Sequence, residues 1–132
     1  SRLDNVKDEQ QLQELVQEIR DRFGLLPPSV IELTNSVRLR WLGEKLGFEK
    51  LTLKNGRLRA YFVANRDDYF NSDIFGRILN FVKSHSRQFK MKDSAGKAML
   101  VIENIERVDT AIDLLSQMAG QTPKSASEIL SR

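Results

Sequence analysis

Few residues of this chain have the chemistry of a catalytic or metal site. It contains one histidine, His85, and no cysteine, which excludes disulfides, thiolate metal sites and a cysteine nucleophile. His85 falls at the end of an expected helix, where a lone histidine is more typical of a surface cation than of a metal ligand. The adjacent Asp67 and Asp68 do not point the same way in a helix or a strand, so we interpret them as turn residues rather than an acid–base pair. We therefore expect no catalytic residue, no cofactor and no metal in this chain.

The segment Asp93–Ala98 is similar to the end of a phosphate-binding loop. The loop requires a glycine where this chain has Met91, and a serine or threonine where Ala98 follows Lys97. The segment also lies between two stretches of strand-like alternation. It is therefore expected to form the turn of a hairpin and not a nucleotide site.

Acidic charge concentrates near the N-terminal end. Residues 1–23 carry six acids and four bases, in a chain whose net charge is +3. Glu18 and Asp21 are three residues apart and therefore share a helix face. That face fits a solvated surface with intrahelical ion pairs, such as Glu18 with Arg22, or a contact with a basic partner.

Basic charge concentrates in the middle of the chain. Residues 38–66 carry eight bases and two acids. Lys54, Arg57 and Arg59 belong to one expected hairpin, and Tyr61 should face outward beside the arginines. Phosphate contacts with stacking would bind nucleic acid, and the same charges would suit an acidic protein. Edge strands also carry lysine and arginine simply to prevent aggregation, so all three interpretations stay open.

Composition indicates one folded domain. The 132 residues are 40% hydrophobic and 30% charged, enough to build a core. No apolar run approaches the roughly 18 to 20 residues of a membrane span, and we expect no signal peptide from the pattern of the first residues. We expect a cytoplasmic protein without membrane contact, and the absence of cysteine is compatible with a reducing compartment. A chain that begins at Ser1 is compatible with a fragment of a longer protein.

Hydrophobic periodicity predicts two helices in the first part of the chain. The first should span Leu3–Phe23 and end at Gly24, with Phe23 and Leu26 anchoring the corner. The second should span Pro28–Leu46, buried on two sides. We interpret its Trp41 as a core residue and Gly47 as its stop. The apolar positions spread around this helix are Val30, Ile31, Leu33, Val37, Leu39, Trp41, Leu42 and Leu46. The expected apolar stripe of the first helix consists of Leu12, Leu15, Val16, Ile19 and Phe23.

The rest of the chain predicts two hairpins and two more helices. Asn55-Gly56 favours a type I′ turn between strands at 51–54 and 57–63, with Leu58, Ala60 and Phe62 facing the core. A helix should run from Asn71 or Ser72 to about His85, a second hairpin should pair 88–91 with 97–103, and a last helix should run from about 106 to 118.

The fold class that follows is α+β, with helices packed on a small antiparallel sheet built from two hairpins. The expected element order is α-α-ββ-α-ββ-α. Residues 1–24 would form the charged helix leading into the domain, and 25–119 its compact core. Residues 120–132 have the composition of a mobile tail.

Several motifs occur in a characteristic order: E-x-x-D-R-F-G-x-L-P from Glu18 to Pro27, V-R-L-R at 37–40, and L-G-F-E-K-L at 46–51. Together they resemble the C-terminal domain of the bacterial transcription-repair coupling factors, the ATP-driven translocases called Mfd. In that family the parent recognises RNA polymerase stalled at DNA damage, displaces it with ATP hydrolysis, and recruits UvrA through a UvrB-like module. The C-terminal domain has no motor motifs, so ATP and magnesium belong to the parent's motor domains.

The resemblance implies a regulatory role in nucleotide excision repair. The family's C-terminal domain folds back onto the UvrB-like module of the same polypeptide and masks its UvrA-binding surface. Glu18 and Asp21 match the acidic positions that face this module, with Arg22 beside them. The domain would be non-catalytic, autoinhibitory and monomeric, and would meet UvrA, RNA polymerase and DNA only through the parent. The alternative is a DNA-binding accessory domain that uses Lys54, Arg57 and Arg59.

Overall fold

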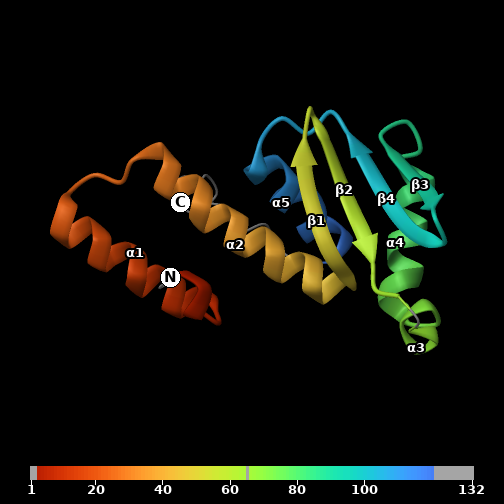
Figure 1. Ribbon diagram of the computed structural model, residues 1–132, viewed down its shortest axis with the longest axis horizontal. Coiled ribbons are helices and arrows are strands. Elements are labelled where there is room, and N and C mark those ends of the chain that lie inside the picture. The colour runs from red at the N-terminus through yellow and green to blue at the C-terminus, as the bar shows by residue number, and fades with distance from the viewer. Residues whose placement is uncertain (1–2, 65, 121–132) are drawn as a thin grey trace.

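The computed structural model describes residues 3–64 and 66–120. Its helices pack on one antiparallel sheet, which confirms the α+β class and the order of the two hairpins (Figure 1). The expectation of a mobile tail falls outside the described residues. The described elements are the 3-10 turn η1 (Leu3–Asn5), α1 (Glu9–Phe23), α2 (Pro28–Leu46), β1 (Phe48–Lys54), β2 (Arg57–Phe62), α3 (Asp67–Phe70), α4 (Asp73–Ser84), β3 (Phe89–Ser94), β4 (Lys97–Glu103) and α5 (Val108–Met118).

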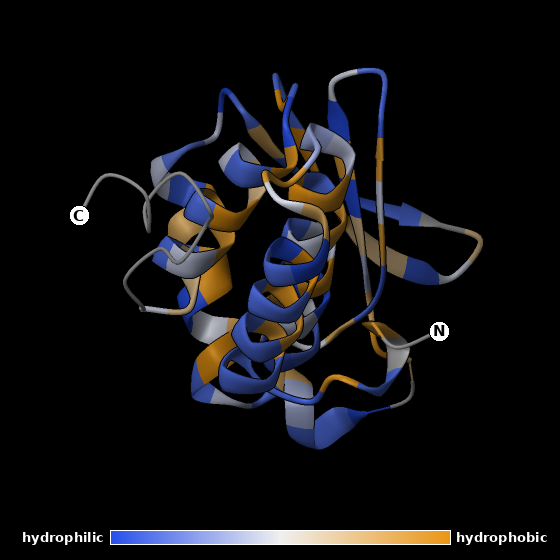
Figure 2. Ribbon diagram, turned by 90° about the vertical axis from the view of Figure 1, so that its left-hand side faces the viewer, coloured by the Kyte–Doolittle hydropathy of each residue, from blue (hydrophilic) through white to orange (hydrophobic). Residues whose placement is uncertain are grey.

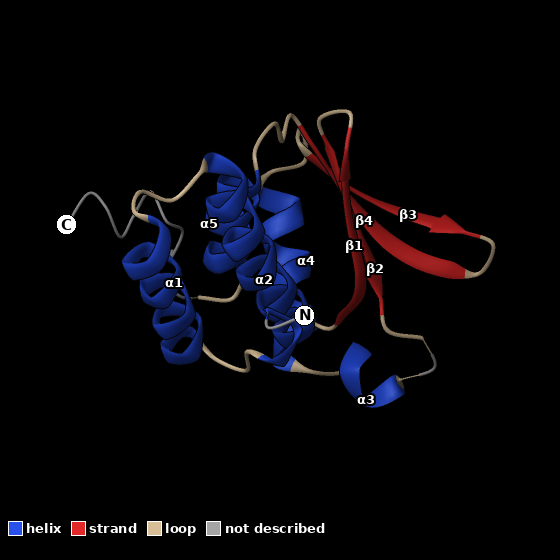
Figure 3. Ribbon diagram, turned by 60° about the vertical axis from the view of Figure 1, so that its left-hand side comes forward, coloured by secondary structure: helices blue, strands red, loops and turns tan. Residues whose placement is uncertain are grey.

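The sheet has the strand order β1-β2-β4-β3, and every neighbouring pair is antiparallel. Helices α2, α4 and α5 lie on one side of it, as Figure 3 shows edge-on. Figure 1 looks onto the opposite face, with α4 and α5 behind the strands. The sheet therefore has one face in the core and one face that no helix of residues 3–64 and 66–120 covers.

Both hairpins turn through two residues with positive φ. Asn55 and Gly56 have φ of 54° and 72°, which confirms the expected type I′ turn. Ala95 and Gly96 have φ of 55° and 79° between β3 and β4. The segment Asp93–Ala98 is thus a hairpin turn and not a phosphate-binding loop.

The main core lies between the helices and the inner face of the sheet. As expected, Leu58, Ala60 and Phe62 are buried there. A smaller cluster beneath α1 is formed by Val6, Leu12 and Leu15, with Trp41 of α2 partly buried against it. Figure 2 shows the matching pattern on the helices, with hydrophobic residues turned inward and hydrophilic residues outward. The larger cluster also contains Leu46, Phe48, Ile78, Phe89, Leu100, Ile102, Ile105, Ile112, Leu115 and Met118.

The first helix begins later than its sequence pattern predicts. It starts at Glu9 because the Asp8 side chain accepts a hydrogen bond from the Gln11 N–H at 2.9 Å and caps the first turn. Leu3–Asn5 form a separate 3-10 turn. The expectation of a helix over Leu3–Phe23 is therefore wrong at its start, where residues 3–8 precede α1.

Two apolar side chains that we expected in the core are exposed. Phe23 is 74% exposed and Leu33 is 53% exposed, so Phe23 does not anchor the corner and the buried stripe of α1 stops short of it. Phe23 is the last residue of α1, Leu33 lies in the first half of α2, and neither belongs to a core cluster. The end of α1 and the start of α2 are remote from the sheet (Figure 1). Hydrophobic periodicity shows which face of a helix is apolar, but it does not show how much of that face a neighbouring element covers.

Glycine ends α2 as expected. Gly47 has φ of 92°, a left-handed conformation that glycine adopts without steric cost. The ring of Tyr69 from α3 packs against it, and the Tyr69 hydroxyl donates a hydrogen bond to the Leu46 carbonyl. Asp67 and Asp68, which we interpreted as turn residues, instead open the short helix α3. None of the described helices is long and apolar enough to cross a membrane.

Candidate functional site

The acidic residues singled out from the sequence lie in the last two turns of α1. Asp21 is exposed, and its Oδ1 accepts a hydrogen bond from Gln17 Nε2 at 2.9 Å. Glu18 is half-buried, and Arg22 is exposed next to Asp21. Arg22 also lies where the helix dipole favours a cation. The structure thus brings all three residues together at the end of α1 remote from the sheet (Figure 1).

Exposed hydrophobic side chains join these charges. Phe23 and Leu25, 74% and 93% exposed, directly follow Arg22 in the chain. Between them, Gly24 ends α1 with φ of 82°, and a Cβ added there would meet nothing within 4 Å. We name Glu18, Asp21, Arg22, Phe23 and Leu25 the α1–α2 corner. Sequence reasoning missed its apolar half, because nothing in the periodic pattern distinguishes a buried Phe23 from an exposed one.

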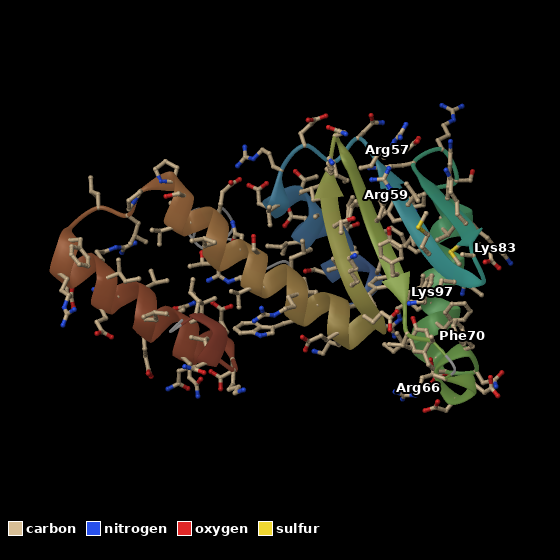
Figure 4. The ribbon with its side chains drawn as sticks, in the orientation of Figure 1. Arg57, Arg59, Arg66, Phe70, Lys83 and Lys97 are labelled. Atoms are coloured by element: carbon tan, nitrogen blue, oxygen red, sulfur yellow. The ribbon has the colours of Figure 1, made fainter. Side chains whose placement is uncertain are left out.

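The basic hairpin residues lie on the sheet face that no described helix covers. Lys54 and Arg57 are direct cross-strand partners, and Arg59 pairs with Thr52 two residues further along. Figure 4 shows Arg57 and Arg59 on β2 and Lys97 on β4. The second hairpin therefore adds basic residues that the sequence reading did not connect with the first.

Other bases of the segment 38–66 do not belong to this face. Arg38 is buried and bound to Glu9 and Asn35. Arg66, next to α3, binds Asp68 through two hydrogen bonds of 3.0 and 3.1 Å. That interaction raises the pKa of the Arg66 guanidinium and lowers the pKa of the Asp68 carboxyl. The local excess of positive charge in the sequence is thus divided among separate surfaces.

His85 is the C-terminal cap residue of α4. Its ring stacks on Phe81 with centroids 4.1 Å apart, and its Nδ1 lies 2.9 Å from the Phe81 carbonyl oxygen. These contacts match its interpretation as a helix-terminus residue. Within residues 3–64 and 66–120, no three His, Cys, Asp or Glu side chains converge in a way that could hold a metal ion.

An open groove of about 480 Å³ lies between α2 and β1. Leu39, Gly43 and Leu51 contribute apolar lining, while Arg40 and Glu44 contribute charge. Gly43 permits the close approach of the two elements, because a Cβ there would lie 2.6 Å from Leu51 Cδ1.

Comparison with known proteins identifies the family of this chain. The sequence model of the TRCF domain family matches residues 1–73, which are more than half of the chain. The chain belongs to the TRCF domain family. The matched region of this TRCF domain contains α1, α2, the first hairpin and the α1–α2 corner.

Similar curated proteins carry the corresponding name. The chain is 33% identical over 91 residues to the transcription-repair-coupling factor of Rickettsia prowazekii, and 30% identical over 91 residues to that of Rickettsia bellii. Each match covers 69% of this chain and 8% of the relative, so the TRCF domain corresponds to a small part of a much longer protein. The resemblance to bacterial transcription-repair coupling factors is thereby confirmed.

Proposed function

We propose that this TRCF domain is a non-catalytic, autoinhibitory domain of a cytoplasmic transcription-repair coupling factor. In this proposal it folds back onto the UvrB-like module of the same polypeptide and masks the surface that recruits UvrA. The contact is made by the α1–α2 corner, with Glu18 and Asp21 pairing with basic groups of the module. ATP, magnesium and RNA polymerase are handled by other parts of the full-length factor.

The observation that carries the proposal is the composition of the corner. Four large hydrophobic side chains of the described residues are markedly exposed, and Phe23, Leu25 and Leu33 among them come from α1, its following loop and the first turns of α2. Exposed apolar side chains beside charged ones are typical of a protein interaction surface. The acids lie next to this apolar group, where they can select a basic partner and fix its orientation.

The free energy expected for the masking contact is small enough for the contact to be reversible, so the domain can act as a lid on the UvrA-binding surface. Exposed ion pairs contribute roughly 0.2–1 kcal/mol each, and an apolar anchor such as Phe23 adds about 1–3 kcal/mol when its exposed surface is buried. A contact of a few kcal/mol keeps the masked state dominant. An activating partner with a comparable preference for the open state can still release it.

The test compares UvrA binding by the full-length factor and by its Glu18→Arg, Asp21→Arg variant. The proposal predicts tighter UvrA binding by the variant, because reversed charges repel the basic partner groups and open the lid. A matched control reverses Glu44 and Asp93, two exposed acids on α2 and β3, and changes the net charge by the same amount. This control should bind UvrA like the wild type.

Circular dichroism and the melting temperature of the variant domain establish that it folds. Unchanged UvrA affinity in a folded corner variant would exclude Glu18 and Asp21 from the masking contact. An equal gain in the corner variant and the control would attribute the effect to net charge, and would also contradict the proposal.

A further inference from the structure

The uncovered face of the sheet gathers basic residues from all four strands. Strand alternation and the observed register place Lys54 and Arg57 in one cross-strand row, Arg59 and Lys90 in the next, and Lys50 and Lys92 in a third. Lys97 lies at the start of β4 on the same face. We name these seven residues the basic sheet face.

The positive charge of this face is only partly neutralised. Glu103 lies between two of the bases, with its carboxylate oxygens 3.7 Å from Arg57 Nε and 3.6 Å from Lys90 Nζ. Glu49 Oε1 lies 3.3 Å from Lys97 Nζ. Within residues 3–64 and 66–120, Lys54, Arg59 and Lys92 form no ion pair. Seven bases against two acids leave a local charge of +5.

Part of this arrangement costs stability, because Glu103 offsets the repulsion between Lys54 and Arg57 only in part. Lys54 and Arg57 are direct cross-strand partners, and like charges in that position are destabilising. Protection of a sheet edge from aggregation does not require them on β2 and β4, because these are the central strands. The bases on the central strands therefore point to a ligand that supplies negative charge.

The face is also shaped to present its charges together. Val101 lies between Arg59 and Lys90 in the register and is only 3% exposed, although no described helix covers this side of the sheet (Figure 3). Burial of this kind is expected where long basic side chains flank an apolar one, since their aliphatic stems pack on apolar surface while the charged ends stay in water. The charged ends of Arg59 and Lys90 are thus presented on the same side of the sheet, on either side of Val101.

The chemistry of the face fits phosphate better than protein. Cores of protein interfaces are depleted in lysine and enriched in exposed aromatic anchors. Here the central strands carry Arg57 and Arg59 beside the apolar side chains of Met99 and Val101, and most of the lysines flank them on the edge strands. Tyr61 is half-buried, with Lys50 Nζ 5.6 Å from its ring centroid. An array of cations without an exposed aromatic anchor matches the repeated charges of a polyphosphate backbone.

We propose that the basic sheet face binds the phosphate backbone of nucleic acid without reading its sequence. This site is separate from the α1–α2 corner and does not depend on the proposed lid. Three bases without an ion pair, together with the four that are shared with carboxylates or a ring, make about three to five phosphate contacts.

The test measures binding of the 132-residue chain to a fluorescein-labelled 30-base-pair duplex and to a single strand of the same length, by fluorescence anisotropy. Affinity for at least one of them should fall steeply between 50 and 200 mM NaCl, with a log–log slope of about −3 to −4 on the duplex. The variant Lys54→Gln, Arg59→Gln, Lys92→Gln should bind about tenfold or more weakly, and its slope should be shallower by about 3.

The matched control is Arg20→Gln, Lys45→Gln, Lys83→Gln. It removes the same charge from exposed positions on three helices, of which Lys83 is seen on α4 in Figure 4. Its affinity should stay within about threefold of the wild type, as for a loss of distant, screened charge. Circular dichroism of both variants confirms the fold.

Equal losses in the two variants would show attraction by net charge alone and would overturn the proposed site. No binding of either nucleic acid at 50 mM NaCl would overturn it as well. Tighter binding to poly-L-glutamate than to nucleic acid, at equal charge concentration, would assign the face to an acidic protein instead.

Discussion

Glu9 and Arg38, 29 residues apart in the chain, are joined by two parallel hydrogen bonds, from Nε to Oε1 at 2.9 Å and from Nη2 to Oε2 at 2.8 Å. A third bond, from Arg38 Nη1 to Asn35 Oδ1 at 3.0 Å, fixes the guanidinium from its own helix. The planar fork of arginine matches a carboxylate in this bidentate geometry. The pair therefore sets how the first turn of α1 lies on the middle of α2.

We predict that removing Glu9 lowers the free energy of unfolding more than replacing Arg38 does. Arg38 is 7% exposed and Glu9 is 29% exposed. Glu9→Ala leaves a buried guanidinium without its anion and should cost about 3 kcal/mol of unfolding free energy. Arg38→Met leaves a carboxylate that water can reach and replaces the buried charge with an apolar side chain, so about 1 kcal/mol is expected. Urea unfolding of both variants measures the difference, and a larger loss in Arg38→Met would contradict this account.

We predict that alanine is much more destabilising at Gly47 than at Gly43. Gly47 has positive φ, and an added Cβ would lie 2.0 Å from a carbon of the Tyr69 ring. Gly47→Ala should therefore cost about 3 kcal/mol through backbone strain and overpacking. Gly43 is helical and its added Cβ would meet a flexible Leu51 methyl beside the open groove. The gain in helix propensity offsets this contact, so Gly43→Ala should change stability by less than about 1 kcal/mol.

Thermal or urea unfolding of the two alanine variants decides this contrast. Comparable losses would mean that Leu51 cannot move, and that the groove between α2 and β1 is more rigid than its open side indicates. A mild effect at Gly47 would mean that Tyr69 is easily displaced.

Tyr69 predicts a stability that falls at alkaline pH. Burial raises the pKa of its hydroxyl well above the ordinary value. The folded state therefore holds the proton more tightly than the unfolded chain, whose tyrosine titrates near pH 10. The contribution of Tyr69 to stability is complete below about pH 10 and decreases as the pH rises above it.

The measurement is the free energy of unfolding between about pH 8 and pH 11 for the wild type and Tyr69→Phe. Tyr69→Phe should be less stable at the lower pH, because the Leu46 carbonyl loses its hydrogen bond, and should lose less stability on alkalinisation. The two proteins differ at this one side chain, so the comparison isolates Tyr69. Parallel pH profiles would contradict its assignment.

Local sequence signals predicted most of the elements. Asn55-Gly56 specifies its turn through two positive φ values, and Ser72 caps α4 by accepting a hydrogen bond from the Phe75 N–H. Such features depend on residues a few positions apart. The class of the fold followed from them, because two hairpins between amphipathic helices have few ways to pack.

The candidate surfaces were predicted less completely because they depend on long-range contacts. Glu18 and Asp21 share a face by helix spacing alone, but the exposure of Phe23 depends on where α2 stops covering α1. The addition of Lys90 and Lys92 to the first hairpin requires the pairing of β2 with β4, which no local signal specifies. Arg38 was counted among the bases of residues 38–66, and the structure shows it buried and bound to Glu9.

We predict that replacing the exposed side chains of the α1–α2 corner leaves the stability of the domain unchanged and alters UvrA binding by the full-length factor. Phe23→Ser with Leu25→Ser should change the unfolding free energy of the domain by less than about 0.5 kcal/mol, as is usual for exposed positions. Leu12→Ala, in the buried stripe of the same helix, should cost about 2–5 kcal/mol. In the full-length factor, the Phe23 and Leu25 variant should nevertheless bind UvrA more tightly, because the lid loses its apolar anchor.

Urea unfolding of the domain and UvrA titration of the full-length factor together check this prediction. Phe23 and Leu25 would have a structural role if their loss destabilised the domain by more than about 1 kcal/mol, since surface positions rarely do so. If stability and UvrA affinity both stayed unchanged, the corner would be neither a support of the fold nor the masking contact. Only a folded variant with increased UvrA affinity agrees with a surface that is kept apolar for an intramolecular partner.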